Sequence, residues 1–163
     1  MQADGVIQRY AIGGAVGATF YLEPVATLDV DIFISLQPDT GSLLISPQPI
    51  FDYLKAHGGI MDGEYIVVAG WPVQFLPAAN PLVVEALEQA VERNVADVPV
   101  RVFTSEHLAA IALQTGRAKD KARLLQFVEA GALDAARFQD IVVRHGLTEA
   151  WQRFERQFLG DNK

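Results

Sequence analysis

The chain has 163 residues, a formal net charge of −7 and no cysteine. This length suits one domain with a core of its own, and the lack of cysteine excludes a disulfide framework and a thiolate metal site. The sequence contains neither a secretory signal nor an apolar run of roughly 18 residues, the length that a membrane-spanning helix needs. We therefore expect a cytoplasmic protein that has no membrane partner.

The charge is divided unevenly: residues 1–103 carry a net −8 and residues 104–163 a net +1. The overall negative charge argues against broad electrostatic attraction to nucleic acid. The acidic first part suits cation binding, whereas a basic cluster in the last part could meet phosphate. A solvated helix face is the alternative interpretation of that cluster. Its members are Arg117, Lys119, Lys121 and Arg123.

Strand-like and helix-like segments alternate over the first part of the chain. The first half of residues 28–36 alternates apolar and polar side chains, which is the period of a strand. Asn80 is a suitable N-cap for a helix that begins at Pro81. In chain order we expect a strand that ends at Gly13-Gly14, a helix over 15–22, a strand over 28–36, a loop over 37–49, a helix over 50–57, a hairpin of 65–69 with 72–76, a helix over 81–93 and a strand over 98–103.

Helical patterns fill the remainder of the chain, from Thr104 onward. Strands with a few helices followed by a run of helices indicate an α/β (α+β) fold, in which a mixed twisted sheet has flanking helices and a helical C-terminal portion. We expect residues 1–103 to form the sheet core and residues 104–163 to pack on it within the same domain. The helical breaks fall near Gly116, Gly131 and Gly146.

Two carboxylates, Asp29 and Asp31, are the most informative polar feature. Residues i and i+2 of a strand point to the same face, so both side chains project together. Two like charges at that spacing raise a pKa unless a cation neutralises them. Oxygen ligands suit Mg²⁺ or Mn²⁺, so the pair predicts a divalent metal site. A solvent-exposed strand face is the alternative.

The glycine pair Gly13-Gly14 precedes Asp29 by a helix-sized interval. A glycine pair after a strand lets the backbone approach a phosphate and direct amide groups at it. The spacing therefore predicts an anion cradle beside a cation site, the combination that a nucleoside triphosphate with its metal requires.

Several segments together resemble the DNA-polymerase-β-like nucleotidyltransferase superfamily, and in particular its small bacterial members related to abortive-infection toxins. Residues 12–14 match the hydrophobic-Gly-Gly turn of that family, and residues 27–32 match its T-x-D-h-D strand. Residues 73–77 resemble the strand that carries a third carboxylate, and residues 117–120 resemble a basic segment of the helical tail. The likeness runs from Tyr10 to Arg123.

The resemblance implies a mixed sheet of the nucleotidyltransferase type and the transfer of a nucleoside monophosphate from a nucleoside triphosphate to a hydroxyl on a small molecule, a protein or RNA. It implies Mg²⁺ or Mn²⁺ as cofactor. The residues that it assigns are Asp29, Asp31 and Gln74 for catalysis, Gly13, Gly14, Thr27, Arg117 and Lys119 for nucleotide binding, and Asp29 and Asp31 for the metal.

Three positions depart from the family pattern. Gln74 stands at the third carboxylate position, and a glutamine amide carries no charge and accepts no proton at neutral pH. Val25 and Ala112 stand where many relatives have an Arg and a Lys. The alternative hypothesis is therefore a catalytically degenerate nucleotidyltransferase-fold protein that acts as a nucleotide-binding or toxin/antitoxin-type partner module. A plain globular domain with an exposed Asp pair is a third.

The remaining candidate residues favour ordinary structural roles. Trp71 and Phe75 could stack a base, but we expect them to pack in the core. Trp151, Phe154 and Phe158 form a helical stripe that predicts a core contact or a homodimer contact. The three histidines lack metal-ligand spacing, and we expect them at the surface or at helix ends. They are His57, His107 and His145.

Overall fold

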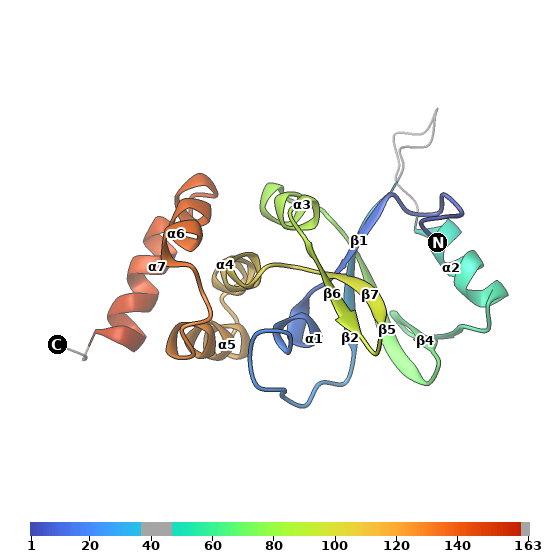
Figure 1. Cartoon of the computed structure of the whole chain (residues 1–163), viewed down its shortest axis with the longest axis horizontal. Coiled ribbons are helices and arrows are strands. Elements are labelled where there is room, and N and C mark those ends of the chain that lie inside the picture. The colour runs from blue at the N-terminus through green and yellow to red at the C-terminus, as the bar shows by residue number, and fades with distance from the viewer. Residues whose placement is uncertain (37–46, 161–163) are drawn as a thin grey trace.

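The computed structural model describes residues 1–36 and 47–160, so most of the loop expected over 37–49 lies outside the described residues. The strands and helices follow one another along the chain as drawn in Figure 1. Their bounds are β1 Arg9–Ile12, α1 Gly14–Ala18, β2 Val30–Ser35, α2 Gln48–Ala56, β3 Ile60–Asp62, β4 Tyr65–Val68, β5 Trp71–Pro77, α3 Pro81–Glu88, β6 Val91–Val95, β7 Val98–Val102, α4 Ser105–Thr115, α5 Ala118–Glu129, α6 Ala135–Arg144, α7 Thr148–Phe154 and a π-helix, η1, Glu155–Leu159.

Within the described residues, seven strands form one mixed sheet in the order β3-β4-β5-β2-β1-β7-β6. The central strand β2 runs parallel to β5 and antiparallel to β1, and β1 runs parallel to β7. The outer strands are joined by antiparallel hairpins, β3 with β4 and β6 with β7. A mixed sheet with flanking helices confirms the expected fold class.

The sheet has a separate apolar core on each face. On one face Ile34 packs with Ile50 and Leu54 of α2. On the other face Phe33 of β2 lies against Phe103, with ring centroids 4.8 Å apart. This second core continues into α1, α3, α4 and the C-terminal helices. Because side chains alternate along β2, its odd-numbered residues face this larger core.

Helix α4 joins the sheet to the C-terminal helices, and Figure 1 shows it between the strands and α5 to α7. Most of its residues are buried, including the charged Glu106. The Thr104 hydroxyl accepts a hydrogen bond from the His107 amide at its start, and Gly116 ends it with φ +65. A glycine is favoured there because the left-handed conformation costs it nothing. No helix in the described part of the chain is long and apolar enough to cross a membrane.

The helix expected over 81–93 is wrong in its second half. Asn80 caps α3 as expected, with its side chain accepting a hydrogen bond from the Val83 amide, but the helix ends at Glu88. Residues 91–95 instead form β6, which pairs with β7 around a tight turn. The local pattern of residues 91–95 suits either a helix or a strand. Cross-strand hydrogen bonds to β7, which follows later in the chain, favour the strand.

Candidate functional site

Asp29 and Asp31 lie at the start of the central strand, on the sheet face that carries the larger core. Asp31 is the second residue of β2, and Asp29 directly precedes the strand. Both residues are half-buried. The Thr27 hydroxyl lies 3.2 Å from the Asp29 carbonyl oxygen and 3.3 Å from its Oδ1, and donates to this residue. Thr27 therefore holds Asp29 in place.

The two glycines of the first turn serve different purposes. Gly14 has φ +55, and a Cβ atom built on it would overlap Oδ2 of Asp31. Only glycine at this position admits the carboxylate. A Cβ atom on Gly13 would come within 2.5 Å of the Phe33 ring, and the Gly13 amide donates to the Asp31 carbonyl oxygen at 3.0 Å. The Gly13 N–H is therefore already bonded within the sheet, while Gly14 opens the space that Asp31 fills.

The charges around Asp31 come from both halves of the chain. Burial raises the pKa of Asp31, and the neighbouring charge of Asp29 raises it further. Lys119, Arg123 and Arg117 oppose this rise with their positive charges. Lys119 and Arg123 belong to α5 and Arg117 is its N-cap residue, so the start of this helix faces the carboxylate pair.

Each of these cations has a distinct setting. Arg117 forms an ion pair with the buried Asp120 one turn further along α5, and its own side chain is 63% exposed. Lys119 is exposed and Arg123 is half-buried. Arg123 was not assigned to the site from the sequence, although its spacing of four residues from Lys119 places the two on one helix face.

Gln74 is the neighbour of Asp31 in the sheet. The parallel pairing of β2 with β5 sets the two residues opposite each other. The antiparallel pairing of β4 with β5 continues the row to Tyr65, because Ile66 lies opposite Val73. The charge of Glu64 raises the pKa of Tyr65, with smaller contributions from burial and from Asp29. A phenol therefore lies beside the carboxylate pair, and only the strand register reveals it.

The two carboxylates of this site suit a metal ion whose other ligands are substrate phosphates and water. Among the described residues, no group of three or more His, Asp or Glu side chains is placed to hold a metal ion. The donors at the site are the carboxylates of Asp29 and Asp31 and the amide oxygen of Gln74. Mg²⁺ is commonly held by one or two carboxylates, with substrate phosphates and water completing its shell. The donor set fits such a metal better than a permanently bound one.

The fold is similar to that of a solved nucleotidyltransferase-like protein. The chain matches the crystal structure of an antigenic nucleotidyltransferase-like protein from Paracoccidioides brasiliensis with a TM-score of 0.55 and 14% sequence identity, over 88% of this chain and 84% of that one. The chain has a nucleotidyltransferase-type fold. The solution structure of the antibiotic-resistance factor ANT(2'')-Ia is also similar, with a TM-score of 0.48 and 14% identity, over 91% of this chain and 88% of that one. No protein-family model and no curated protein matches the chain.

One expectation about the aromatic side chains outside this site is wrong. Trp71 is 59% exposed at the start of β5, whereas Phe75 packs on the core beside α2 as expected. His107 lies at a helix end as expected, in the first turn of α4, but it is fully buried. Its Nδ1 lies 2.8 Å from the Thr104 hydroxyl and its Nε2 lies 3.1 Å from Glu85.

The buried histidine belongs to a polar cluster that joins α3 to the C-terminal helices. Glu85 of α3 accepts hydrogen bonds from Arg144 of α6 and lies 2.8 Å from Nε2 of His145. This Glu85 cluster comprises Glu85, His107, Arg144 and His145. The cluster links α3, α4 and the end of α6, so its role is to hold these helices together.

Proposed function

We propose that this protein transfers a nucleoside monophosphate from a nucleoside triphosphate to a hydroxyl acceptor, with Mg²⁺ or Mn²⁺ held by Asp29 and Asp31. The observation that carries the proposal is the Asp31 carboxylate, which packs on Gly14, lies beside Asp29 and faces the cations of α5. Transfer of a phosphoryl group needs carboxylates that hold a metal ion and cationic side chains that bind the phosphate oxygens.

In the proposed reaction the acceptor hydroxyl loses its proton to water, its oxygen attacks the α-phosphorus, the bond from that phosphorus to the bridging oxygen of the β-phosphate breaks, and pyrophosphate leaves. The metal supplies positive charge to the phosphate oxygens when it is bound. Lys119 and Arg123 of α5 would bind the same phosphate oxygens. Arg117 would contribute the guanidinium N–H groups that are not bonded to Asp120. Thr27 positions Asp29, and Gly14 leaves the space in which the Asp31 carboxylate lies. Catalysis rests on positioning and charge neutralisation.

The glutamine at position 74 favours a second candidate function. Gln74 lies opposite Asp31, where a third carboxylate would complete the metal shell and take the acceptor proton. The amide can coordinate through its oxygen, but it cannot accept that proton. A protein of this kind would bind a nucleotide without turnover and act as a nucleotide-binding or toxin/antitoxin-type partner module.

Transfer of label from α-³²P nucleoside triphosphates distinguishes the two functions. The full chain is incubated with each triphosphate, with Mg²⁺ or Mn²⁺, and with small-molecule, RNA and protein acceptor pools that include the chain itself. We expect labelled product with the unaltered chain and with Lys55→Gln, a control on α2 across the sheet, and at least a hundredfold less with Asp29→Asn. Calorimetry that detects triphosphate binding without labelled product would support the partner module. Neither binding nor transfer would refute both functions.

A further inference from the structure

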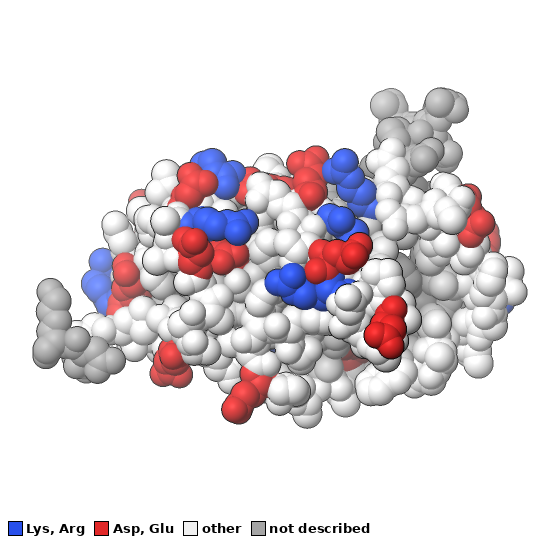
Figure 2. Space-filling model, viewed as in Figure 1, with Lys and Arg blue, Asp and Glu red and all other residues white. Residues whose placement is uncertain are grey.

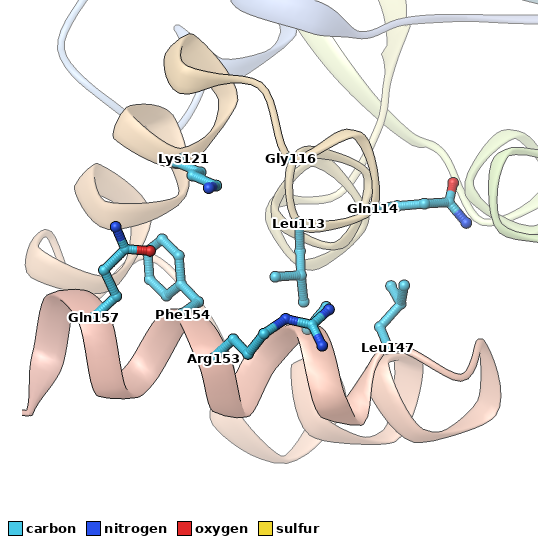
Figure 3. Close-up of a pocket in the computed structure, with 9 residues that line it drawn as sticks. Leu113, Gln114, Gly116, Lys121, Leu147, Arg153, Phe154 and Gln157 are labelled. Atoms are coloured by element: carbon cyan, nitrogen blue, oxygen red, sulfur yellow. The ribbon is translucent and has the colours of Figure 1, made fainter.

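A groove lies in the helical portion, between the end of α4, the first turns of α5 and the helix formed by α7 and η1. It has a volume of about 320 Å³, at the lower end of the roughly 300–1,000 Å³ typical of small-molecule sites. Figure 3 shows α4 nearly end-on above α7, with α5 to one side. Lys119 and Arg123 of the carboxylate site are not among its lining residues.

The groove combines apolar and cationic side chains. Leu113, Leu147 and Phe154 supply the apolar part of its lining. In Figure 3 Lys121 reaches in from α5, Gln157 stands across from it beside Phe154, and Arg153 lies below Leu113.

The charge of the groove is of one sign. Of the described residues that line it, none is acidic, although the chain has 20 acids and 13 Lys and Arg residues. The partner of Arg153 is Glu149, at 3.8 Å and with a side chain that is 91% exposed. An exposed pair at that distance contributes little, so Arg153 remains available to another anion. Two cations thus lie beside an apolar surface without an acid to neutralise them inside the groove.

The backbone beside the groove is unusual as well. After Phe154 the helix continues as the π-helix η1 over Glu155–Leu159, and Gln157 belongs to this segment. π-helical turns are rare and occur frequently at functional sites, because they give up regular α-helical bonding for a different placement of side chains. Here the π-helical turn carries one wall of the groove.

From these features we propose that the groove binds a small organic anion, a carboxylate or phosphate attached to an apolar body of about one ring. Lys121 holds the anionic group, Gln157 donates through its amide, Arg153 adds positive charge from α7, and the apolar body lies on Leu113 and Phe154. This site is separate from the proposed nucleotidyltransferase site and needs neither metal nor nucleotide.

The test uses the full ¹⁵N-labelled chain, without metal or nucleotide, and follows backbone amide signals during titration. The probes are phenyl phosphate, phenylacetate, the neutral benzyl alcohol and inorganic phosphate. We expect both aromatic anions to shift the signals of Lys121, Phe154 and Gln157 in a saturable manner. Benzyl alcohol and inorganic phosphate should bind about tenfold more weakly, because each offers one half of the interaction. The two aromatic anions show whether the groove prefers phosphate or carboxylate.

Substitutions locate the bound anion. Lys121→Gln should weaken phenyl phosphate binding about tenfold, and Lys55→Gln, on α2, should leave it unchanged. Arg153→Gln alters an exposed side chain and should weaken binding about threefold, which keeps the test valid if Lys121→Gln disturbs folding. The proposal would be overturned if benzyl alcohol bound as tightly as phenyl phosphate, or if both groove variants bound phenyl phosphate as tightly as the unaltered chain. It would also be overturned if Arg123→Gln, rather than the groove variants, weakened phenyl phosphate binding. The absence of saturable shifts at the groove would overturn it as well.

Discussion

Replacing Glu85 by glutamine tests how firmly the helical portion is held on the sheet. The Glu85 carboxylate lies on α3 with a side chain that is 16% exposed, and it pairs with Arg144 and His145 of α6 and with His107 of α4. Hydrogen bonds from Arg144, opposed by burial and aided by the two histidines, lower its pKa from 4.5 to about 2. Glutamine keeps the size of the side chain and removes the charge.

The size of the effect follows from proton linkage. A fall in pKa from 4.5 to about 2 corresponds to about 3 kcal/mol of stabilisation by the ionised carboxylate. Because the folded pKa lies below the unfolded one, this contribution is complete above pH 4.5 and is lost as the pH falls toward 2. Between these values the unfolded chain binds the additional proton, so acid favours unfolding.

Urea unfolding at several pH values measures this contribution. At pH 7 we expect Glu85→Gln to lower the free energy of unfolding by about 3 kcal/mol, and the difference from the unaltered chain to shrink as the pH approaches 2. Glu88→Gln is the matched control, because Glu88 also lies on α3 but is 58% exposed in a pair with Arg9 at 3.7 Å. A loss at pH 7 no larger than that of Glu88→Gln, or a difference that does not depend on pH, would refute the reasoning.

Three further predictions concern the carboxylate site. Gly14→Ala should destabilise the chain by more than the roughly 1–2 kcal/mol that a left-handed alanine costs, and it should abolish transfer, because its Cβ overlaps Asp31. Gly5 has φ +69 and open space around it, so Gly5→Ala should show only this backbone cost. Thermal unfolding compares the two variants. Mn²⁺ with a nucleoside triphosphate should raise the melting temperature of the unaltered chain but not of Asp31→Asn, and an equal rise in both would place the metal elsewhere. Gln74→Asp should increase labelled transfer roughly 10²-fold, the lower end of a general-base contribution; unchanged transfer would mean that position 74 does not limit the reaction.

Signals that lie within a few residues predicted their elements well. The Asn80-Pro81 pair marks the start of α3, the period of two marks β2, and Gly116 marks the end of α4. Each is a local preference that tertiary packing reinforces, so it can be recognised without knowledge of the rest of the chain.

Features that depend on distant partners were not predictable in this way. Strands β3 and β6 are defined by pairing with β4 and β7, and their short sequences alone suit several conformations. The burial of His107 depends on Glu85, which lies 22 residues earlier. In the candidate site the sequence indicated the Asp pair, the glycines and Gln74, but the position of Tyr65 beside them emerged only from the strand register.

The helix α4 makes the two halves of the chain dependent on each other. The sheet half carries the net negative charge and the helical half the positive one, and around Asp31 the acids come from the first and the bases from the second. On the face in Figure 2 basic groups stand next to acidic ones. A fragment that ended at residue 103 would keep its carboxylates without counter-charges and would uncover the buried face against which Leu108 and Leu113 pack. Fragments 1–103 and 104–163, expressed separately, should therefore form the carboxylate site only when they associate with each other.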